Sequence, residues 1–260
     1  MTKYSSIAAL LFASVLAACG TKEVQTLTGL EPHARVKFFN FGVNAPSVNF
    51  YADATKMTAI QSTTGAESTT GIAYGGVGAA GAYSSLDPGQ HTLAGKIAAA
   101  TDKDLTIASV TTTVEDGKYY SYYMSGFYNT TTKTVDSFIV QDDFPISDDT
   151  TKATVRFVHA ISNAAPMTLF VKSTTTAAET PIGAEIAYKG ATAFITIPSG
   201  SYDLITRFNG STTAAVSRTG VSFVARKVYT ITARGDITVA PTTTGCAAAN
   251  RTCLDNTSNR

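Results

Sequence analysis

Hydrophobic and polar side chains alternate along two stretches of the chain that resemble each other. In Ala34–Asn40 and in Ala153–His159, apolar side chains recur at every second position, as Val36 and Phe38 do in the first stretch. A period of two residues is typical of a β-strand that buries one face. The two stretches therefore predict equivalent strands in two copies of the same unit.

Three more pairs of segments continue this repeat in the same order. Each pair combines a strand pattern with a turn signal such as Pro or Gly, which favours a change of chain direction. Turn signals about eight to twelve residues apart are typical of a sandwich of roughly seven strands. The pairs are Asn44–Tyr51 with Asn163–Phe170, Tyr83–Leu93 with Phe194–Leu204, and Lys118–Tyr123 with Lys227–Thr232.

This ordered repeat predicts an all-β protein with two tandem β-sandwich domains. β-Branched and aromatic residues are frequent, and they suit pleated, half-buried strands. We place the first domain at 34–143 and the second at 152–240. An acidic linker at 144–151 joins them, and a C-terminal tail at 241–260 follows the second domain.

Tyr120 and Tyr229 occupy equivalent positions at the start of the last repeated strand. In Greek-key sandwiches, a tyrosine at such a position bonds through its phenol to the backbone across a corner of the fold. We therefore expect two tyrosine corners, one in each domain.

The N-terminal residues 1–18 have the pattern of a secretory signal peptide. A positively charged start precedes the apolar run Ile7–Leu16, which is too short to span a membrane because a spanning helix needs about 20 apolar residues. Leu16–Cys19 resembles the bacterial lipobox, in which the cysteine accepts a diacylglyceryl group. We expect cleavage before Cys19 and a lipidated N-terminus and linker at 19–33. The alternative is an ordinary secretory signal with an unmodified cysteine.

A lipid on Cys19 would hold the protein on a membrane in the bacterial cell envelope, on its periplasmic or outer surface. The other two cysteines, Cys246 and Cys253, would then lie in an oxidising compartment. Their short separation favours a disulfide, with two free thiols as the alternative. Two cysteines without a nearby His are too few for a zinc site, so no metal is expected there.

The formal net charge is +1, and charged residues make up 15% of the chain. Lys and Arg are spread thinly, without the basic face that holds a phosphate backbone. The sequence therefore argues against nucleic acid as a partner.

Loop residues at equivalent places in the two copies are the candidate binding groups. They are Asn40, Asn44, His159 and Asn163, in the predicted loops 40–47 and 159–166. The predicted loop 60–72 is a third candidate. Function on sandwich folds gathers in such loops. His159 has two interpretations, a hydrogen bond that fixes its loop or a role as a ligand or catalyst.

Two acidic pairs, Asp142-Asp143 and Asp148-Asp149, lie near the junction of the two copies. Paired carboxylates can hold a hard cation such as Ca²⁺, but the Asp-rich spacing of a calcium loop is missing from the sequence. A solvated linker between the domains is the favoured interpretation.

Several of these segments resemble a known bacterial family, the domain of unknown function 4397, which occurs in secreted and lipid-anchored proteins. The resemblance rests on Arg156–Ala160, Asn44–Tyr51 and Pro198–Tyr202. The first copy departs from the pattern because Asn40 stands where the second copy has His159. The resemblance implies an immunoglobulin-like fold in both domains, and it brings no catalytic residues.

These features predict a non-catalytic envelope lipoprotein, without a cofactor, that binds an extracellular or periplasmic protein or glycan or acts as a spacer. Two alternatives come from other classes of protein. A secreted hydrolase or metal-dependent enzyme would need a cleft that brings His159 near the acidic pairs. A subunit of an envelope assembly would need an exposed apolar patch or an unpaired strand edge.

Overall fold

The structure is a computed structural model that describes residues 33–58, 70–145, 149–239 and 250–259. All of these residues belong to one compact unit, Pro32–Arg260. Several predicted features lie outside the described residues: the signal peptide 1–18, Cys19, most of the loop 60–72, Asp148 and Cys246.

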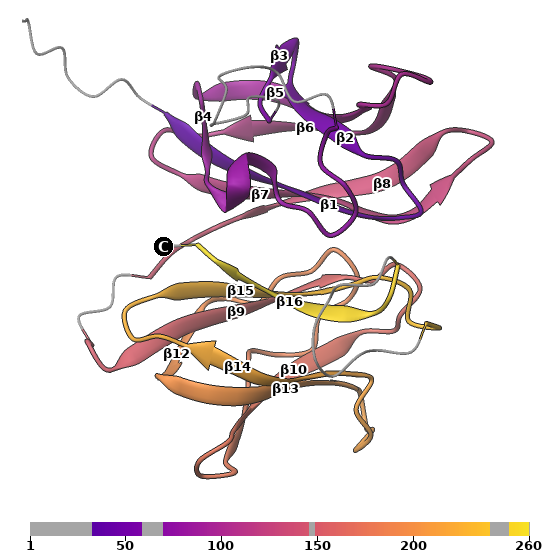
Figure 1. Cartoon of the computed structure of the whole chain (residues 1–260). Coiled ribbons are helices and arrows are strands. Elements are labelled where there is room, and N and C mark those ends of the chain that lie inside the picture. Colours follow the sequence, from indigo (N-terminus) through magenta and orange to yellow (C-terminus); the bar gives the residue numbers. More distant parts are fainter. Residues whose placement is uncertain (1–32, 59–69, 146–148, 240–249, 260) are drawn as a thin grey trace, which may run out of the picture. The chain divides into compact units, whose positions relative to one another are not determined.

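The first sandwich is formed by β1 (Ala34–Val43), β2 (Val48–Ala52), β3 (Thr55–Lys56), β4 (Ser84–Leu86), β5 (Gly89–Ile97), β6 (Thr106–Val114), β7 (Tyr119–Asn129) and β8 (Thr134–Gln141). These strands form two four-stranded sheets, with the orders β4-β1-β7-β8 and β3-β2-β5-β6 (Figure 1). A short 3-10 turn, η1 (Gly78–Gly81), precedes β4.

The second sandwich is formed by β9 (Lys152–Ala160), β10 (Met167–Ser173), β11 (Glu179–Pro181), β12 (Ile195–Pro198), β13 (Gly200–Phe208), β14 (Val216–Phe223), β15 (Val228–Arg234) and β16 (Cys253–Ser258). Its two four-stranded sheets have the orders β12-β9-β15-β16 and β11-β10-β13-β14. In the part of the chain that the structure describes, no helix has the length and apolar character needed to cross a membrane.

The two sandwiches share one topology, because each strand of the second takes the place of its counterpart in the first. In the first, β1 runs parallel to β7 with Val36 opposite Tyr120. In the second, β9 runs parallel to β15 with Val155 opposite Tyr229. This common register confirms that the alternating stretches are copies of one unit. The predicted all-β class, with tandem β-sandwiches, is confirmed.

Each sandwich has its own hydrophobic core between its two sheets. Val36 and Phe38 point from β1 into the first core, and Phe38 stacks on Phe50 of the opposite sheet with ring centroids 5.2 Å apart. Burying a side chain of this size stabilises the fold by about 1.5–3 kcal/mol. The apolar positions of the alternating pattern are thus the residues that point into the two cores. The second core includes Val155, Phe157, Leu169, Val171, Leu204 and Ile231.

The last strand, β16, corrects the predicted C-terminal tail at 241–260. Cys253–Ser258 pair antiparallel with β15 and complete a four-stranded sheet, so the second sandwich has two sheets of four strands, as the first has, and not roughly seven strands. The prediction was wrong because this segment has little apolar alternation and is defined by its pairing with β15. Cys253 is disulfide-bonded. Its pairing with Cys246 stays a prediction, because Cys246 lies outside the described residues.

Tyr120 and Tyr229 form the predicted tyrosine corners. The backbone N–H of Glu115 donates to the Tyr120 hydroxyl at 3.1 Å, and the N–H of Val224 donates to the Tyr229 hydroxyl at 3.1 Å. Each bond fastens the turn before the strand to the strand itself. The equal geometry of the two corners is further evidence for the repeat.

Candidate functional site

Asn40 and His159 lie inside strands, and not in loops as the sequence predicts. Asn40 belongs to β1 and His159 to β9, and both residues are fully buried. The Asn40 amide donates to the carbonyl of Ile72 at 2.8 Å, and its oxygen accepts from the N–H of Gly42 at 3.2 Å. The prediction was wrong because a polar residue after an alternating pattern usually marks the end of a strand. Here the strand continues through Asn40, whose side chain bonds to nearby backbone groups.

His159 makes the corresponding contacts in the second sandwich. Its Nδ1 accepts from the N–H of Ile161 at 3.3 Å, and its Nε2 donates to the carbonyl of Ala165 at 3.2 Å. Burial lowers the pKa of the imidazole, and hydrogen bonds with the backbone of Ala165 and of His159 itself partly oppose that shift. This geometry matches the interpretation of His159 as a residue that fixes its loop.

Asn44 and Asn163 lie in the loops that follow β1 and β9, where the sequence places them. Asn44 has a φ of 62°, and its N–H donates to the side-chain oxygen of Asn250 at 2.9 Å. The Asn163 amide donates to the carboxylate of Asp236 at 2.8 Å. Both asparagines therefore tie their loops to the last part of the second sandwich.

The outward faces of β1 and β9 meet in a buried layer, which we call the seam. Alternation along β1 turns Lys37, Phe39 and Phe41 away from the first core, and the equivalent residues of β9 turn away from the second. Both strands are therefore buried on two faces. The apolar members of the seam are Phe39, Phe41, Tyr123, Phe138, Val158 and Ala160, which pack as a third hydrophobic cluster.

Arg156 crosses the seam from the second sandwich and binds the end of β8 in the first. Its Nη1 donates to the carbonyl of Gln141 at 3.1 Å, and its Nη2 donates to the carboxylate of Asp142. Its Nε donates to the Thr230 hydroxyl at 3.0 Å, and the guanidinium lies 4.7 Å from the ring centroid of Phe194. All three nitrogens are bonded, which offsets the cost of taking this charge out of water.

Lys37 crosses the seam in the opposite direction and binds the end of β16. Its Nζ donates to the carbonyl of Ser258 at 3.1 Å and to the side-chain oxygen of Asn259 at 3.4 Å. The amine also lies 4.4 Å from the ring centroid of Tyr83. Like Arg156, it is a buried cation against an aromatic ring, with acceptors that come from the other sandwich.

The contacts of the two cations are equivalent, so the seam has an approximate two-fold symmetry. Gln141 and Ser258, which accept bonds from the cations, each lie opposite the corner tyrosine of their own sandwich. Asp142 and Asn259, the other acceptors, follow them directly in the chain. An interface in which both partners use the same patch is isologous, as in a two-fold dimer. The repeat thus pairs with itself inside one chain.

Asp142 does not belong to a solvated linker, which corrects the interpretation from the sequence. Its side chain is 0% exposed and is paired with Arg156. Its Oδ2 also accepts bonds from the hydroxyls of Tyr83 at 2.6 Å and Ser121 at 2.8 Å. The interpretation was wrong because the segment that follows β8 begins with Asp142, and this residue is buried in the seam. Across the described ranges, no three His, Cys, Asp or Glu side chains gather as a metal site.

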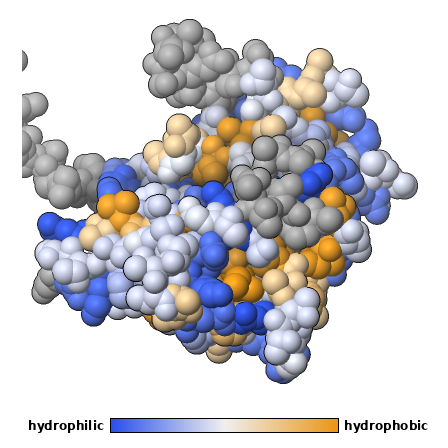
Figure 2. Space-filling model, turned by 60° about the horizontal axis from the view of Figure 1, so that its bottom comes forward, coloured by the Kyte–Doolittle hydropathy of each residue, from blue (hydrophilic) through white to orange (hydrophobic). Residues whose placement is uncertain are grey.

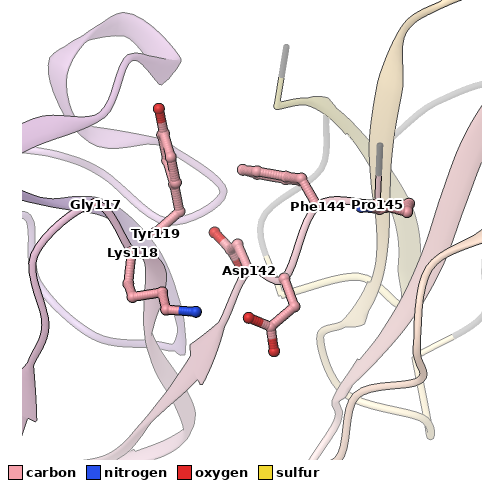
Figure 3. Close-up of a pocket in the computed structure, with 7 residues that line it drawn as sticks. Gly117, Lys118, Tyr119, Asp142, Phe144 and Pro145 are labelled. Atoms are coloured by element: carbon pink, nitrogen blue, oxygen red, sulfur yellow. The ribbon is translucent and has the colours of Figure 1, made fainter. Parts of the chain in front are cut away.

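A pocket of about 410 Å³ lies beside the segment that leaves the first sandwich (Figure 3). The rings of Tyr119 and Phe144 form part of its wall, with centroids 5.2 Å apart and an interplanar angle of 66°. In Figure 3 the Lys118 side chain points toward the segment that carries Asp142. Aromatic rings beside charged groups suit a polar ligand with one apolar face.

The seam is the feature that periodicity alone misses, although the sequence carries two signals for it. Lys37 and Arg156 are basic residues at equivalent positions of the repeat, and each is followed directly by Phe. The consecutive Phe38 and Phe39 interrupt the alternation, which is typical of a strand buried on both faces. The acceptor residues at the ends of β8 and β16 have no sequence pattern that would predict their contact with the cations.

In a comparison with known proteins, one family model matches both copies of the repeat. The model of the family described as Domain of unknown function (DUF4397) matches residues 34–167 and 153–252. No curated protein matches the chain significantly. Among solved structures, the chain is similar to the Bacillus anthracis TIE protein, with 12% sequence identity and a TM-score of 0.25. That match covers 79% of this chain and 34% of the other, so the chain spans about a third of that protein's length.

Asp142→Asn is expected to destabilise the protein by about 3–5 kcal/mol, because it leaves the Arg156 guanidinium buried without its carboxylate partner. Urea unfolding followed by circular dichroism measures the change. Asp143→Asn is the matched control, because it makes the same chemical change at an exposed neighbour. Equal stability of the two variants would contradict the role assigned to Asp142.

The protonation of His159 should make stability fall as the pH drops below the usual pKa of histidine. Burial lowers the pKa of the folded imidazole below its usual 6.5. Just below that value, the unfolded chain binds a proton that the folded chain does not, so stability falls as the pH drops. His159→Asn, which copies Asn40, should remove this dependence. The free energies of unfolding of both proteins near pH 7 and pH 5 check it, and parallel changes would show that His159 does not contribute.

Proposed function

This chain belongs to the family described as Domain of unknown function (DUF4397), and we propose that it is a non-catalytic lipoprotein of the bacterial cell envelope. In this proposal, lipid on Cys19 holds the protein on a membrane. The two sandwiches act as a rigid spacer that presents a binding surface to a protein or a glycan.

The observation that carries the proposal is the burial of β1 and β9 on both faces. Domains of one chain move relative to each other by default, unless a large apolar interface joins them. Here Phe39 and Phe41 share one cluster with Val158 and Ala160. The two buried cations add directional bonds across the same contact. Joined in this way, the loops of one sandwich keep fixed positions relative to those of the other.

We place the ligand in the pocket beside Asp142. Its volume of about 410 Å³ falls within the range of small-molecule sites, roughly 300–1,000 Å³. The rings of Tyr119 and Phe144 offer a surface on which the apolar face of a sugar or a peptide side chain can stack. Lys118 supplies hydrogen-bond donors at the same pocket. These features support the choice of a glycan or a protein as the partner.

The enzyme alternative depends on a reactive His159. Its side chain is 0% exposed and both ring nitrogens bind backbone groups, so a substrate has no access to it in this structure. The structure therefore offers the enzyme alternative no support at the residue on which it depends.

The alternative of an assembly subunit depends on an exposed apolar patch or an unpaired strand edge, and the apolar surface can be assessed from the described residues. The large exposed hydrophobic side chains among the described residues are Leu105, Phe127 and Val224, which belong to three different segments. On the face drawn in Figure 2, several groups of hydrophobic residues are visible among hydrophilic ones. Scattered apolar residues of this kind are normal on a protein surface. They give no reason to prefer an assembly over a spacer.

Cys19→Ser should abolish lipid attachment, because the serine hydroxyl does not replace the thiol that accepts the diacylglyceryl group. Cells fed with radiolabelled palmitate should label the wild-type protein and should leave the Cys19→Ser protein unlabelled. Cys246→Ser is the matched control, because it removes another cysteine and should keep the label. An unlabelled wild-type protein, or a labelled Cys19→Ser protein, would overturn the proposed anchor.

A further inference from the structure

The two cations of the seam are equivalent in position, but they face chemically different partners. Arg156 faces the carboxylate of Asp142, whereas Lys37 faces the carboxamide of Asn259. A symmetric seam would pair each cation with a carboxylate. The seam instead sets a primary amine against an amide, and these two groups can condense to a new amide with loss of ammonia.

We propose that Lys37 and Asn259 form an intramolecular isopeptide bond. The bond joins the first strand of the first sandwich to the residue that follows the last strand of the second. It forms after folding, because only the fold brings together two residues that lie 222 positions apart in the chain. The proposal depends on neither the lipid anchor nor a ligand.

The two groups already lie in contact inside the seam. Lys37 Nζ is 3.4 Å from Asn259 Oδ1, and the amide carbon to be attacked is bonded to that oxygen. Lys37 is 1% exposed and Asn259 is 9% exposed, so water competes little for either group. Asn259 Nδ2 donates to the Thr230 hydroxyl at 2.7 Å, which holds the amide in one orientation. Groups held in this way react as if at a very high concentration.

The amine must lose its charge before it can act as a nucleophile. Burial lowers the pKa of Lys37 to about 8, although the negative charge of Asp142 opposes this shift and the positive charge of Arg156 adds to it. A fraction of the amine is therefore neutral near neutral pH. Arg156, at the equivalent position, has a guanidinium instead of a primary amine and offers no such nucleophile.

Tyr83 lies where the reaction needs a hydrogen-bond donor, and Asp142 holds it there. The Tyr83 hydroxyl is 2.6 Å from Asp142 Oδ2 and 3.4 Å from Asn259 Oδ1. The amide oxygen gains negative charge during the attack, and the Tyr83 hydroxyl stabilises that charge when its proton turns from Asp142 toward Oδ1. The Asp142 carboxylate accepts from the Tyr83 hydroxyl and so holds it beside the amide.

The step balances without a further reactant. The lone pair of Lys37 Nζ forms a bond to the amide carbon of Asn259, and the bond from that carbon to Nδ2 breaks. One proton passes from Nζ to Nδ2, so that the nitrogen leaves as ammonia, and nothing is oxidised or reduced. The product is about 17 Da lighter, and it carries a covalent amide where the seam has a hydrogen bond.

Peptide mapping of the full-length protein tests this bond. Trypsin does not cut after Lys37 once its amine is acylated, so the reduced and alkylated digest should contain Val36–Lys56 joined to Thr252–Arg260. The joined species should be about 17 Da lighter than the sum of its two peptides. Separate Phe38–Lys56 and Thr252–Arg260 peptides, without the joined species, from folded protein would overturn the proposal.

Four variants locate the reaction. Lys37→Met and Asn259→Ala should each abolish the joined species, and its survival in either would overturn the assignment. Asn250→Ala is the matched control, because it changes another asparagine of the same segment and should leave the joined species intact. Tyr83→Phe should slow its formation after synthesis by about a hundredfold in a pulse-chase, with the far-ultraviolet circular dichroism unchanged. An unchanged rate would remove Tyr83 from the reaction.

Discussion

Two buried cations, Lys37 and Arg156, hold the contact on which the arrangement of the described chain depends. Each lies on a strand whose other face packs into its own core, and each reaches acceptors at the end of the last strand of the other sandwich. A buried charge is costly unless it is paired and hydrogen-bonded. If the two sandwiches packed with their strands shifted, both cations would lose their acceptors. The buried cations therefore disfavour every register of the seam except the observed one.

Duplication explains how one strand pattern can serve two purposes. Equivalent residues of the two copies meet as the subunits of a two-fold dimer do, but the shared chain makes the association independent of protein concentration. The copies differ at one acceptor, where Asp142 stands opposite Arg156 and Asn259 stands opposite Lys37. Together with the difference between Arg156 and Lys37, it separates an ion pair from a pair of groups that can react. The proposed spacer role and the proposed covalent bond both depend on the same contact.

The sequence predicts the cores well because a period of two residues leaves a local trace, as it does at Val36 and Phe38. It does not predict β16, because Cys253–Ser258 has little alternation and becomes a strand only by pairing with its neighbour. It does not predict the seam either. The pairing of Arg156 with Asp142 depends on how two folded units pack, and the spacing of residues along the chain does not record that packing.

Scanning calorimetry of the chain from residue 20 onward tests most directly whether the seam makes the two sandwiches one cooperative unit. The account predicts a single unfolding transition in which the calorimetric and van't Hoff enthalpies agree. Two separate transitions, or a calorimetric enthalpy about twice the van't Hoff value, would show that the sandwiches unfold independently and would contradict it.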